Sequence, residues 1–300
     1  VTLNVIAQYL QVLYNKEVAE AARSQAELSA FEVRRQKALV EAGKVAEATL
    51  YDMEAVAAQD ELQVVAAGND IKTALVNLAN LLQLPMSDSF DVAPIDFGEP
   101  SLPMPDDVYR QASVGYSSLL GARQAVKVAD QGISVAKSGY IPTLRFNAGV
   151  GSNYYHLSGL PGETFAEQMR HNMQTYLGFS LAIPIFDGFN TRNSIRRAKF
   201  QKNDAMLEVE RQESELYKEI QLAYYQAKGA KERYDTSAGT LEKTRLSFEA
   251  TRERFNLGRA TQADYEQARN NLFKTEITRI QSRYEYLLRH RILLFYSGEK

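Results

Sequence analysis

Residues 191–257 constrain the fold more than any other part of the chain, because this stretch contains no proline and only isolated glycines. At about 1.5 Å per residue, one helix of this length would measure on the order of 100 Å. Such a helix cannot bury itself in one globular core and must join a coiled coil or a bundle. Its side chains form two lines with a seven-residue spacing, which predicts a left-handed coiled-coil seam. The first line is Ile220, Ala227, Tyr234, Leu241, Phe248 and Phe255, and the second, mostly small line is Leu216, Ala223, Ala230, Ser237, Thr244 and Thr251.

The amino-terminal part follows the same plan. Residues 1–42 predict one helix with a seven-residue seam at Val5, Val12, Ala19, Ala26, Val33 and Val40. A turn follows with Gly43 at its centre, where a helix end favours a left-handed residue. A second helix is predicted from about Glu47 to Leu84, so the two helices form an antiparallel hairpin. The long helix likewise ends at a turn around Gly258, and a last helix runs to about Tyr296.

The two helical hairpins are copies of each other. A shift of 215 residues places Gly43 on Gly258 and superimposes the two seven-residue seams. The same shift pairs Tyr9 with Tyr224, Gln11 with Gln226, Glu17 with Glu232, Ala48 with Ala263 and Glu61 with Glu276. We interpret the chain as a duplicated unit of helix, strand, strand, long helix, turn and helix. The second copy spans 106–297, and the first lacks its opening helix and both strands.

Two runs of alternating side chains predict a β-hairpin, with strands at 143–155 and 173–185. One face of each run is apolar, with Leu144, Phe146, Ala148, Val150 and Tyr154 in the first run and Met173, Leu177, Phe179, Leu181, Ile183 and Ile185 in the second. The other face is polar or small. Each run is about 11–13 residues long, and a tilted membrane-spanning strand needs roughly 9–11. The polar loop from His156 to His171, with Tyr154, Tyr155 and Tyr176 near it, is typical of an outer loop and its aromatic girdle. An ordinary amphipathic hairpin packed on a soluble core is the alternative.

The chain therefore divides into segments of different character. Residues 85–105 hold five of the eight prolines and predict a linker with little regular structure. The acidic start at Asp106 predicts a helix that continues to about Ser138. The expected division is a first helical hairpin at 1–84, the linker at 85–105, a helix at 106–141, the β-hairpin at 142–186 and the long helical hairpin at 187–300.

Composition excludes several classes of function. The net charge of −2 gives no electrostatic reason to expect nucleic-acid binding. There is no cysteine, the three histidines are far apart, and no Gly-rich phosphate loop or nucleophile–base motif is present, so we expect no enzyme, metal site or cofactor. The chain has no run of about 18 apolar residues, so the sequence predicts no transmembrane helix. Because Val1 opens directly into a helical pattern, we expect the chain to start inside a larger protein.

Three motifs flank the strands and the second turn: YIPTL (140–144), IPIFDGF (183–189) followed by Arg192, and FNLGRATQADYEQA (255–268). With the duplication, they resemble the outer-membrane channel proteins of the TolC type, also called outer-membrane efflux proteins. The resemblance covers essentially the whole chain and departs in the missing amino-terminal part, which in the family carries the export signal and the first hairpin.

The resemblance implies a mainly α protein with a β-barrel part, located in the outer membrane of a Gram-negative bacterium and extending into the periplasm. It implies a homotrimer in outer-membrane lipid, in which three chains close one transmembrane barrel of about twelve strands. The helices continue as an α-barrel tunnel. A periplasmic adaptor docks at the tip and connects an inner-membrane pump. The implied function is passive export of small molecules or polypeptides, in a tripartite efflux pump or a type I secretion system.

The resemblance also assigns site residues. The tip residues, which would meet the adaptor, are Gly43, Lys44, Gly258, Arg259, Ala260 and Thr261. For the two glycines the alternative is a purely structural turn. Asp264 would form a ring at the closed aperture, where three carboxylates favour cations and repel one another. Its alternative is a helix N-terminal acid that interacts with the dipole.

Some members of the family carry a second aspartate three residues after the first, where this chain has Gln267. Asp52, at the equivalent position of the first copy, could supply that charge. Arg145 and Asn147 would face the lumen, or water on the outside of a soluble hairpin. The competing function is a structural coiled-coil protein, such as a periplasmic adaptor or a membrane-bending scaffold. Adaptors lack both the duplication and the β-hairpin, so the two strands discriminate between these functions.

Overall fold

The computed structural model describes residues 2–85, 87, 90–94, 101–156, 158 and 162–298. It divides into two compact units, one formed by the residues up to 116 together with those from 215 onward, and the other by residues 117–214. The long helix α6 (Asn190–Asn256) contributes its first part to the second unit and the rest to the first. Over the described residues, no helix combines the length and apolar character needed to cross a membrane.

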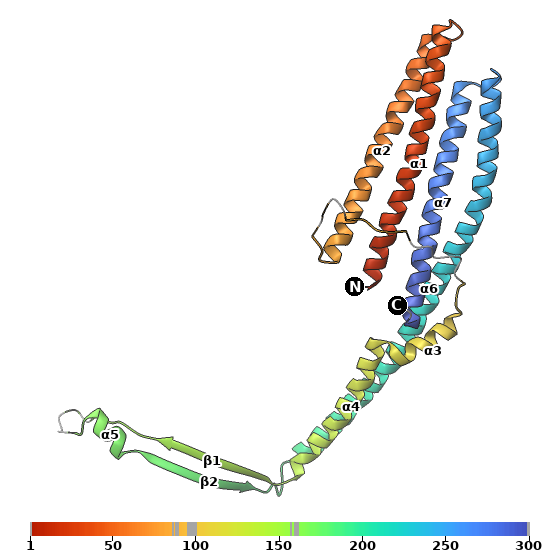
Figure 1. The fold of residues 1–300 in the computed structure, drawn as a ribbon. Helices are drawn as coiled ribbons and strands as arrows, with labels where there is room; N and C mark the ends of the chain where they lie inside the picture. The colour runs from red at the N-terminus through yellow and green to blue at the C-terminus, as the bar shows by residue number, and fades with distance from the viewer. Residues whose placement is uncertain are drawn as a thin grey trace. The chain divides into compact units, whose positions relative to one another are not determined.

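The first unit is built on helices α1 (Thr2–Glu41), α2 (Glu47–Leu81) and α7 (Gln262–Ser297), which run side by side (Figure 1). The predicted seam of α1 is buried or half-buried throughout. The two predicted lines of α6 are likewise buried or half-buried, with Ile220, Ala227 and Ala230 completely covered. The heptad pattern therefore identified the inner face of each helix correctly.

Small side chains allow these helices to approach closely. Ala19 and Ala22 of α1 pack against Ala67 of α2, and Phe273 of α7 covers the same cluster. A larger cluster follows along α1 and α2, consisting of Val12, Ala74, Leu75 and Leu78 with Val5, Ile71, Phe90 and Val92 packed against it. The core is thus a long strip between helices, as expected for a coiled coil.

The two turns at the hairpin ends have the same backbone conformation and equivalent hydrogen bonds. Gly43 and Gly258 both have φ +68°. In the first turn the amide of Lys44 donates to the Leu39 carbonyl, and in the second the amide of Arg259 donates to the Arg254 carbonyl. This pattern is the Schellman motif, which needs a left-handed residue. The duplication inferred from the sequence therefore extends to backbone geometry.

We expect Gly258→Ala to destabilise the helical hairpin by roughly 1–2 kcal/mol, because a Cβ is strained in the left-handed region. Gly239→Ala, in the middle of α6, is the matched control: both positions have open space for a Cβ, but Gly239 has no positive φ. There alanine should stabilise by about 0.5–1 kcal/mol. Thermal unfolding followed by helical circular dichroism would compare the two, and equal effects would contradict a conformational role for Gly258.

The described part of the Pro-rich linker is fixed along α1. The Tyr9 hydroxyl donates to the Ala93 carbonyl over 2.6 Å, and the Lys16 ammonium donates to the Val92 carbonyl over 3.0 Å. Lys16 also pairs with Asp91, and this contact lowers the pKa of the Asp91 carboxyl. Pro100, one of the five prolines of the predicted linker, lies outside the described residues. The segment 90–94 is therefore a strap without regular secondary structure rather than a loose connection.

The single helix predicted for 106–141 is wrong in one respect. The structure has two helices there, α3 (Pro105–Gly115) and α4 (Ser117–Lys137), followed by a short 3-10 turn at Ser138–Tyr140. Tyr116 is extended, with φ −69° and ψ 117°. Gly115 weakens the helix at this point, and the Tyr116 ring lies 6.1 Å from that of Tyr296 of α7. Tertiary packing of one aromatic ring thus accompanies the helix break.

In the second unit, α4 and the first part of α6 are antiparallel and lead into the β-hairpin (Figure 1). Three polar contacts join the two helices: Ser118 with Gln212, Arg123 with Glu213 and Lys202 with Asp130. Ser118 and Arg123, in the first half of α4, contact residues 212 and 213 of α6, whereas Asp130, farther along α4, contacts Lys202, which gives the antiparallel direction.

Candidate functional site

The two strands form an antiparallel hairpin whose register matches the predicted faces. β1 (Thr143–Gly151) pairs with β2 (Gln174–Ala182). Leu144 stands opposite Leu181, and Phe146 opposite Phe179, with their two rings 5.0 Å apart. Phe179 is 75% exposed and Leu177 73%. The apolar face is continuous across both strands and, within the described residues, nothing covers it.

The opposite face is polar or small. Arg145 pairs with Ser180 and Asn147 with Gly178, and both predicted lumen residues are exposed. Tyr176 belongs to this face as well, since it stands opposite Gly149 and its ring lies over the place where a Cβ of Gly149 would be. The sequence places Tyr176 near an expected aromatic girdle, but the alternation of side chains puts it on the face of Arg145 and Asn147. This glycine therefore leaves room for an aromatic ring.

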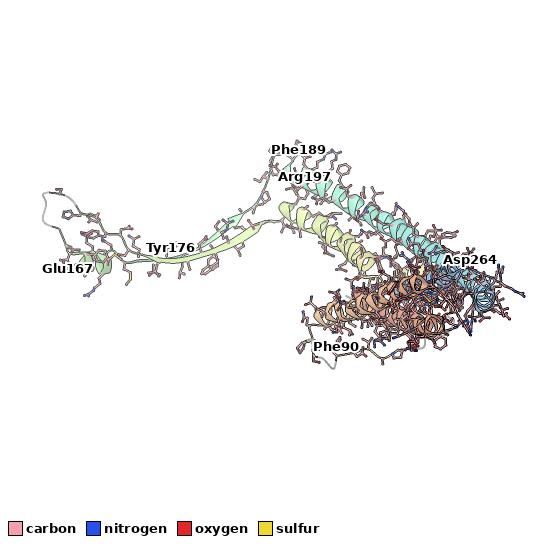
Figure 2. All side chains as sticks on the ribbon, turned by 90° about the horizontal axis from the view of Figure 1, so that it is seen from above. Phe90, Glu167, Tyr176, Phe189, Arg197 and Asp264 are labelled. Carbon is pink, nitrogen blue, oxygen red and sulfur yellow. The ribbon has the colours of Figure 1, made fainter. Side chains whose placement is uncertain are left out.

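The strands have nine residues each, fewer than the 11–13 predicted, because the ladder runs only from the Thr143–Ala182 pair to the Gly151–Gln174 pair. A short helix, α5 (Phe165–His171), provides hydrogen-bond partners for the backbone beyond the end of β1. The buried Gln168 side chain accepts from the Tyr155 amide and donates to the Tyr155 carbonyl. Figure 2 labels Glu167 on this helix and Tyr176 on the adjacent strand.

The polar character of residues 156–171 predicts a loop, so the helix α5 was not predicted. Part of that interval, residues 157 and 159–161, lies outside the described residues. The signal for the helix was present as Thr164 followed three residues later by Glu167. The Thr164 side chain accepts from the Glu167 amide, and the Glu167 carboxylate accepts from the Thr164 amide. This reciprocal pair is a capping box.

At the hairpin tips, Lys44, Arg259 and Thr261 are exposed, and Ala260 is half-buried. The two tips differ in how the next helix begins. Thr261 caps α7 with a capping box, whereas Ala46 at the equivalent place before α2 makes no side-chain cap. The tips share a backbone motif but present different side chains.

Asp264 is the second half of the capping box at the start of α7. Its carboxylate accepts from the Thr261 hydroxyl over 2.7 Å and from the Thr261 amide over 3.0 Å. These hydrogen bonds hold the pKa of the Asp264 carboxyl below its usual range. The arrangement gives Asp264 a defined structural task, and the residue is also exposed, so its charge reaches solvent.

Asp264 lies at one end of a polar groove between α6 and α7. The groove has a volume of about 700 Å³ and is lined by Lys243, Thr244, Ser247, Thr251, Arg254, Asp264, Gln267, Ala268, Asn271, Lys274 and Thr275. Gln267 donates a hydrogen bond to Asn271 rather than supplying a second charge. Asp52, the predicted second acid, is exposed on α2 and does not line this groove.

A buried ionic cluster that sequence reasoning missed joins α7 to the first hairpin. Arg269 is 3% exposed and pairs with Asp60 of α2 over 3.0 Å and with Glu266 of its own helix over 2.9 Å. It also donates to the Ser29 hydroxyl of α1, and that hydroxyl donates to Asp60. The cluster therefore connects three helices through one guanidinium group.

Burial raises the pKa of two groups at this cluster, Glu266 and Tyr265. Desolvation raises the pKa of the Glu266 carboxyl, and Arg269 opposes that rise only in part. Tyr265 is 1% exposed, stacks on Phe255 at 4.9 Å, and has its pKa raised to about 12 by burial. Among the described residues, the Tyr265 hydroxyl and Arg269 Nε have no hydrogen-bond partner. The sequence signal for the cluster was Arg269, a charged residue on the inner face of α7 four residues after the buried Tyr265.

Other contacts link the same two hairpins. Glu17 of α1 accepts from Arg283 and from the Tyr284 hydroxyl, both over 2.8 Å. Near the tips, Arg35 of α1 donates to the Asn256 side chain of α6 over 2.5 Å. Among the described residues, no group of three or more His, Asp or Glu side chains could hold a metal ion.

Comparison with known proteins places these features in a family. The family described as "Outer membrane efflux protein" matches residues 108–299. The outer membrane efflux protein BepC of Brucella suis is 22% identical over 293 residues, which cover 98% of this chain and 62% of that protein. The outer membrane protein TolC of Vibrio cholerae is 27% identical over 175 residues, 57% of this chain and 38% of that protein.

Solved structures agree on the fold. The CmeC outer membrane channel of Campylobacter jejuni matches with a TM-score of 0.72 at 17% identity, over 99% of this chain and 62% of that one. The open state of the MtrE outer membrane channel of Neisseria gonorrhoeae matches with a TM-score of 0.69 at 17% identity, over 99% of this chain and 66% of that one. The chain spans less than two thirds of the length of these relatives. The relatives named here are channels or outer-membrane proteins, and none is named as an enzyme.

Proposed function

The chain belongs to the outer membrane efflux protein family, and we propose from this membership and the geometry above that it forms part of a passive export conduit. Its location is the outer membrane of a Gram-negative bacterium, with the helical part extending into the periplasm. Small molecules or polypeptides would leave through the pore without any bond being made or broken. The observation that carries the proposal is the β-hairpin with one apolar face and one polar face.

The hairpin explains why several chains must assemble. Its two strands leave outer edges with unpaired backbone groups, which are costly in lipid. Closure of a barrel by three copies would pair these edges and leave no free strand in the membrane. The apolar face, with Leu177 and Phe179, would meet lipid, and the face with Arg145 and Asn147 would line water.

The helical hairpins would form the periplasmic tunnel, and their tips would dock a periplasmic adaptor that connects an inner-membrane pump. The exposed side chains of Lys44 and Arg259 support this role, because they can meet a partner at the hairpin tips. Thr261 is exposed beside them, with its hydroxyl held in the capping box. The glycines at 43 and 258 shape the tips, and we assign them no direct contact.

Asp264 would contribute a ring of three carboxylates at the closed aperture. Its lowered pKa supports this role, because the hydrogen bonds from Thr261 keep the carboxylate charged at a pH where an ordinary aspartate takes up a proton. Three such charges would bind cations at the narrow aperture, and cations held tightly there would impede the flow of ions. Asp52 remains a proposed second acid of the aperture.

The test is ion conductance in planar bilayers with the full-length protein and two variants. Asp264→Ala should raise the conductance, because it removes the charge at the aperture. Thr261→Ala is the control: it breaks the capping box, at a cost of about 1 kcal/mol, and leaves the carboxylate in place. It should leave conductance unchanged.

An equal rise in both variants would assign the effect to the helix cap and not to the charge. An unchanged conductance in Asp264→Ala would keep the pore and remove Asp264 as its gate. No conductance from folded, inserted protein would overturn the conduit itself. The family match supports the conduit over a coiled-coil scaffold, and migration on unheated against heated gels separates a barrel trimer from a scaffold.

A further inference from the structure

A row of cations lies at the start of α6, close behind the second strand. Arg192, Arg196 and Lys199 are spaced by four and three residues, which places them on one face of the helix. All three side chains are exposed. Figure 2 labels Phe189 and Arg197 at this end of α6, next to the point where the hairpin joins. The positive charge is therefore concentrated at one place in the second unit.

These cations lack acidic partners. Within the described residues, no carboxylate forms an ion pair with Arg192, Arg196 or Lys199. The two acids on the adjoining segments are engaged elsewhere: Asp187 accepts hydrogen bonds from the amide and hydroxyl of Thr191, and Asp130 pairs with Lys202. The link after β2 and the first turns of α6, residues 183–204, hold five basic residues and two acidic residues, Asp187 and the exposed Asp204. The surface is available to an anion from outside the chain.

Apolar side chains lie immediately beside the cations. Ile185 is 96% exposed and Phe186 76%. The Phe186 and Phe189 rings are 5.6 Å apart, and the Arg192 guanidinium lies 6.0 Å from the Phe189 ring. Phe189 has φ +65°, which is uncommon for a residue with a side chain and costs free energy. The backbone thus holds exposed aromatic rings next to the cation row instead of burying them.

We infer that this surface binds the headgroups of anionic phospholipids in the membrane leaflet that faces the periplasm. The inference rests on the proposed membrane-spanning hairpin. Aromatic rings at the end of a spanning strand sit at the boundary of the hydrocarbon core, and arginine and lysine one or two turns away reach the phosphates. Guanidinium groups match phosphate oxygens in two parallel hydrogen bonds.

The dimensions fit a headgroup layer. From Arg192 to Lys199 the helix rises about 10 Å. The polar region on each side of a bilayer is roughly 5–8 Å thick, and the long arginine and lysine side chains can span the remaining few ångströms. A soluble anion would account for the cations, but it would not account for the exposed Ile185 and Phe186 beside them. A lipid accounts for both features.

The test measures lipid selectivity by electron spin resonance of the full-length protein in phosphatidylcholine vesicles. Spin-labelled phosphatidylglycerol and spin-labelled phosphatidylcholine report how much of each lipid is immobilised at the protein surface. The wild type should prefer phosphatidylglycerol by about threefold or more at low salt. The triple variant Arg192→Gln, Arg196→Gln, Lys199→Gln should bring the ratio close to one.

The control is Lys218→Gln, Lys228→Gln, Arg252→Gln, which removes the same charge from exposed positions farther along α6 and should retain the preference. For the wild type alone, 1 M salt should also abolish the preference, since screening weakens exposed charges. Equal selectivity in wild type and triple variant, or a preference that salt does not change, would overturn the inference. Absence of any immobilised lipid in wild type would instead contradict the membrane-spanning hairpin.

Discussion

Phe179→Arg is expected to prevent assembly of the protein in a membrane. Phe179 lies in the middle part of β2, and its ring packs on Phe146 of β1 on the apolar face. An arginine on the lipid face of a barrel costs about 2–4 kcal/mol at the bilayer midplane. A trimer repeats that cost three times, so the effect should exceed that of the other single changes. The readout is the fraction of protein that refolds into vesicles and migrates as a heat-sensitive trimer on gels.

Asn147→Arg is the matched control for this prediction. It introduces the same side chain on the neighbouring strand, but on the opposite face, where Asn147 stands across from Gly178. If this face lines water, the arginine stays hydrated and assembly should proceed as in the wild type. Failure of Asn147→Arg together with success of Phe179→Arg would reverse the assignment of the two faces. Normal assembly of both variants would remove the hairpin from the membrane.

The sequence predicted the helices well because their pattern is long and regular. In α6, seven-residue spacing over many turns fixes the inner face without knowledge of the partner helix, and the prediction of 191–257 differs from the structure by one residue at each end. The conformation of the two turns was also predicted correctly. Glycine just after a helix end indicates a left-handed φ, which the structure has at positions 43 and 258. The family match confirms the resemblance that these patterns suggested.

Local and tertiary effects explain what the sequence analysis missed. The break at Tyr116 accompanies an aromatic contact with Tyr296, 180 residues away in sequence, and the local signal beside it, Gly115, weakens a helix without by itself ending it. The capping box at Thr164 and Glu167 was visible, but the high polarity of its surroundings favoured a loop interpretation. The aperture and adaptor roles of Asp264, Asp52 and the tip residues stay predictions, because they concern contacts between chains.

The buried cluster around Arg269 shows the same limit. Glu266 and Arg269 have the i, i+3 spacing of an ordinary surface pair, and a single sequence does not reveal that Asp60 and Ser29 of other helices close around them. Disruption of this cluster should nevertheless cause the largest loss of stability that we expect within the helical part. The guanidinium group is the shared partner of two carboxylates that are mostly removed from water.

Arg269→Met should therefore destabilise the helical part by roughly 3–5 kcal/mol, since removal of one member of a buried ion pair leaves the other uncompensated. Here two acids, Asp60 and Glu266, are left. Arg245→Met on α6 is the control, because Arg245 is exposed and its pair with Glu249 is worth about 1 kcal/mol or less. Chemical unfolding followed by helical circular dichroism measures both. A similar small loss in the two variants would contradict the buried cluster.

The pH dependence of unfolding distinguishes electrostatic from packing contributions to stability at this site. Burial raises the pKa of Glu266, so its contribution to stability is fully present below the ordinary glutamate pKa and is lost as pH rises through the raised value. At neutral pH the charged carboxylate is therefore a cost, and Glu266→Gln should raise the unfolding temperature there while the gain shrinks on acidification. Adding Asp60→Asn and Glu266→Gln to Arg269→Met should recover most of the loss, because it removes the uncompensated charges. If the triple variant is as unstable as Arg269→Met, the guanidinium group stabilises these helices by packing, and charge compensation is not its main contribution.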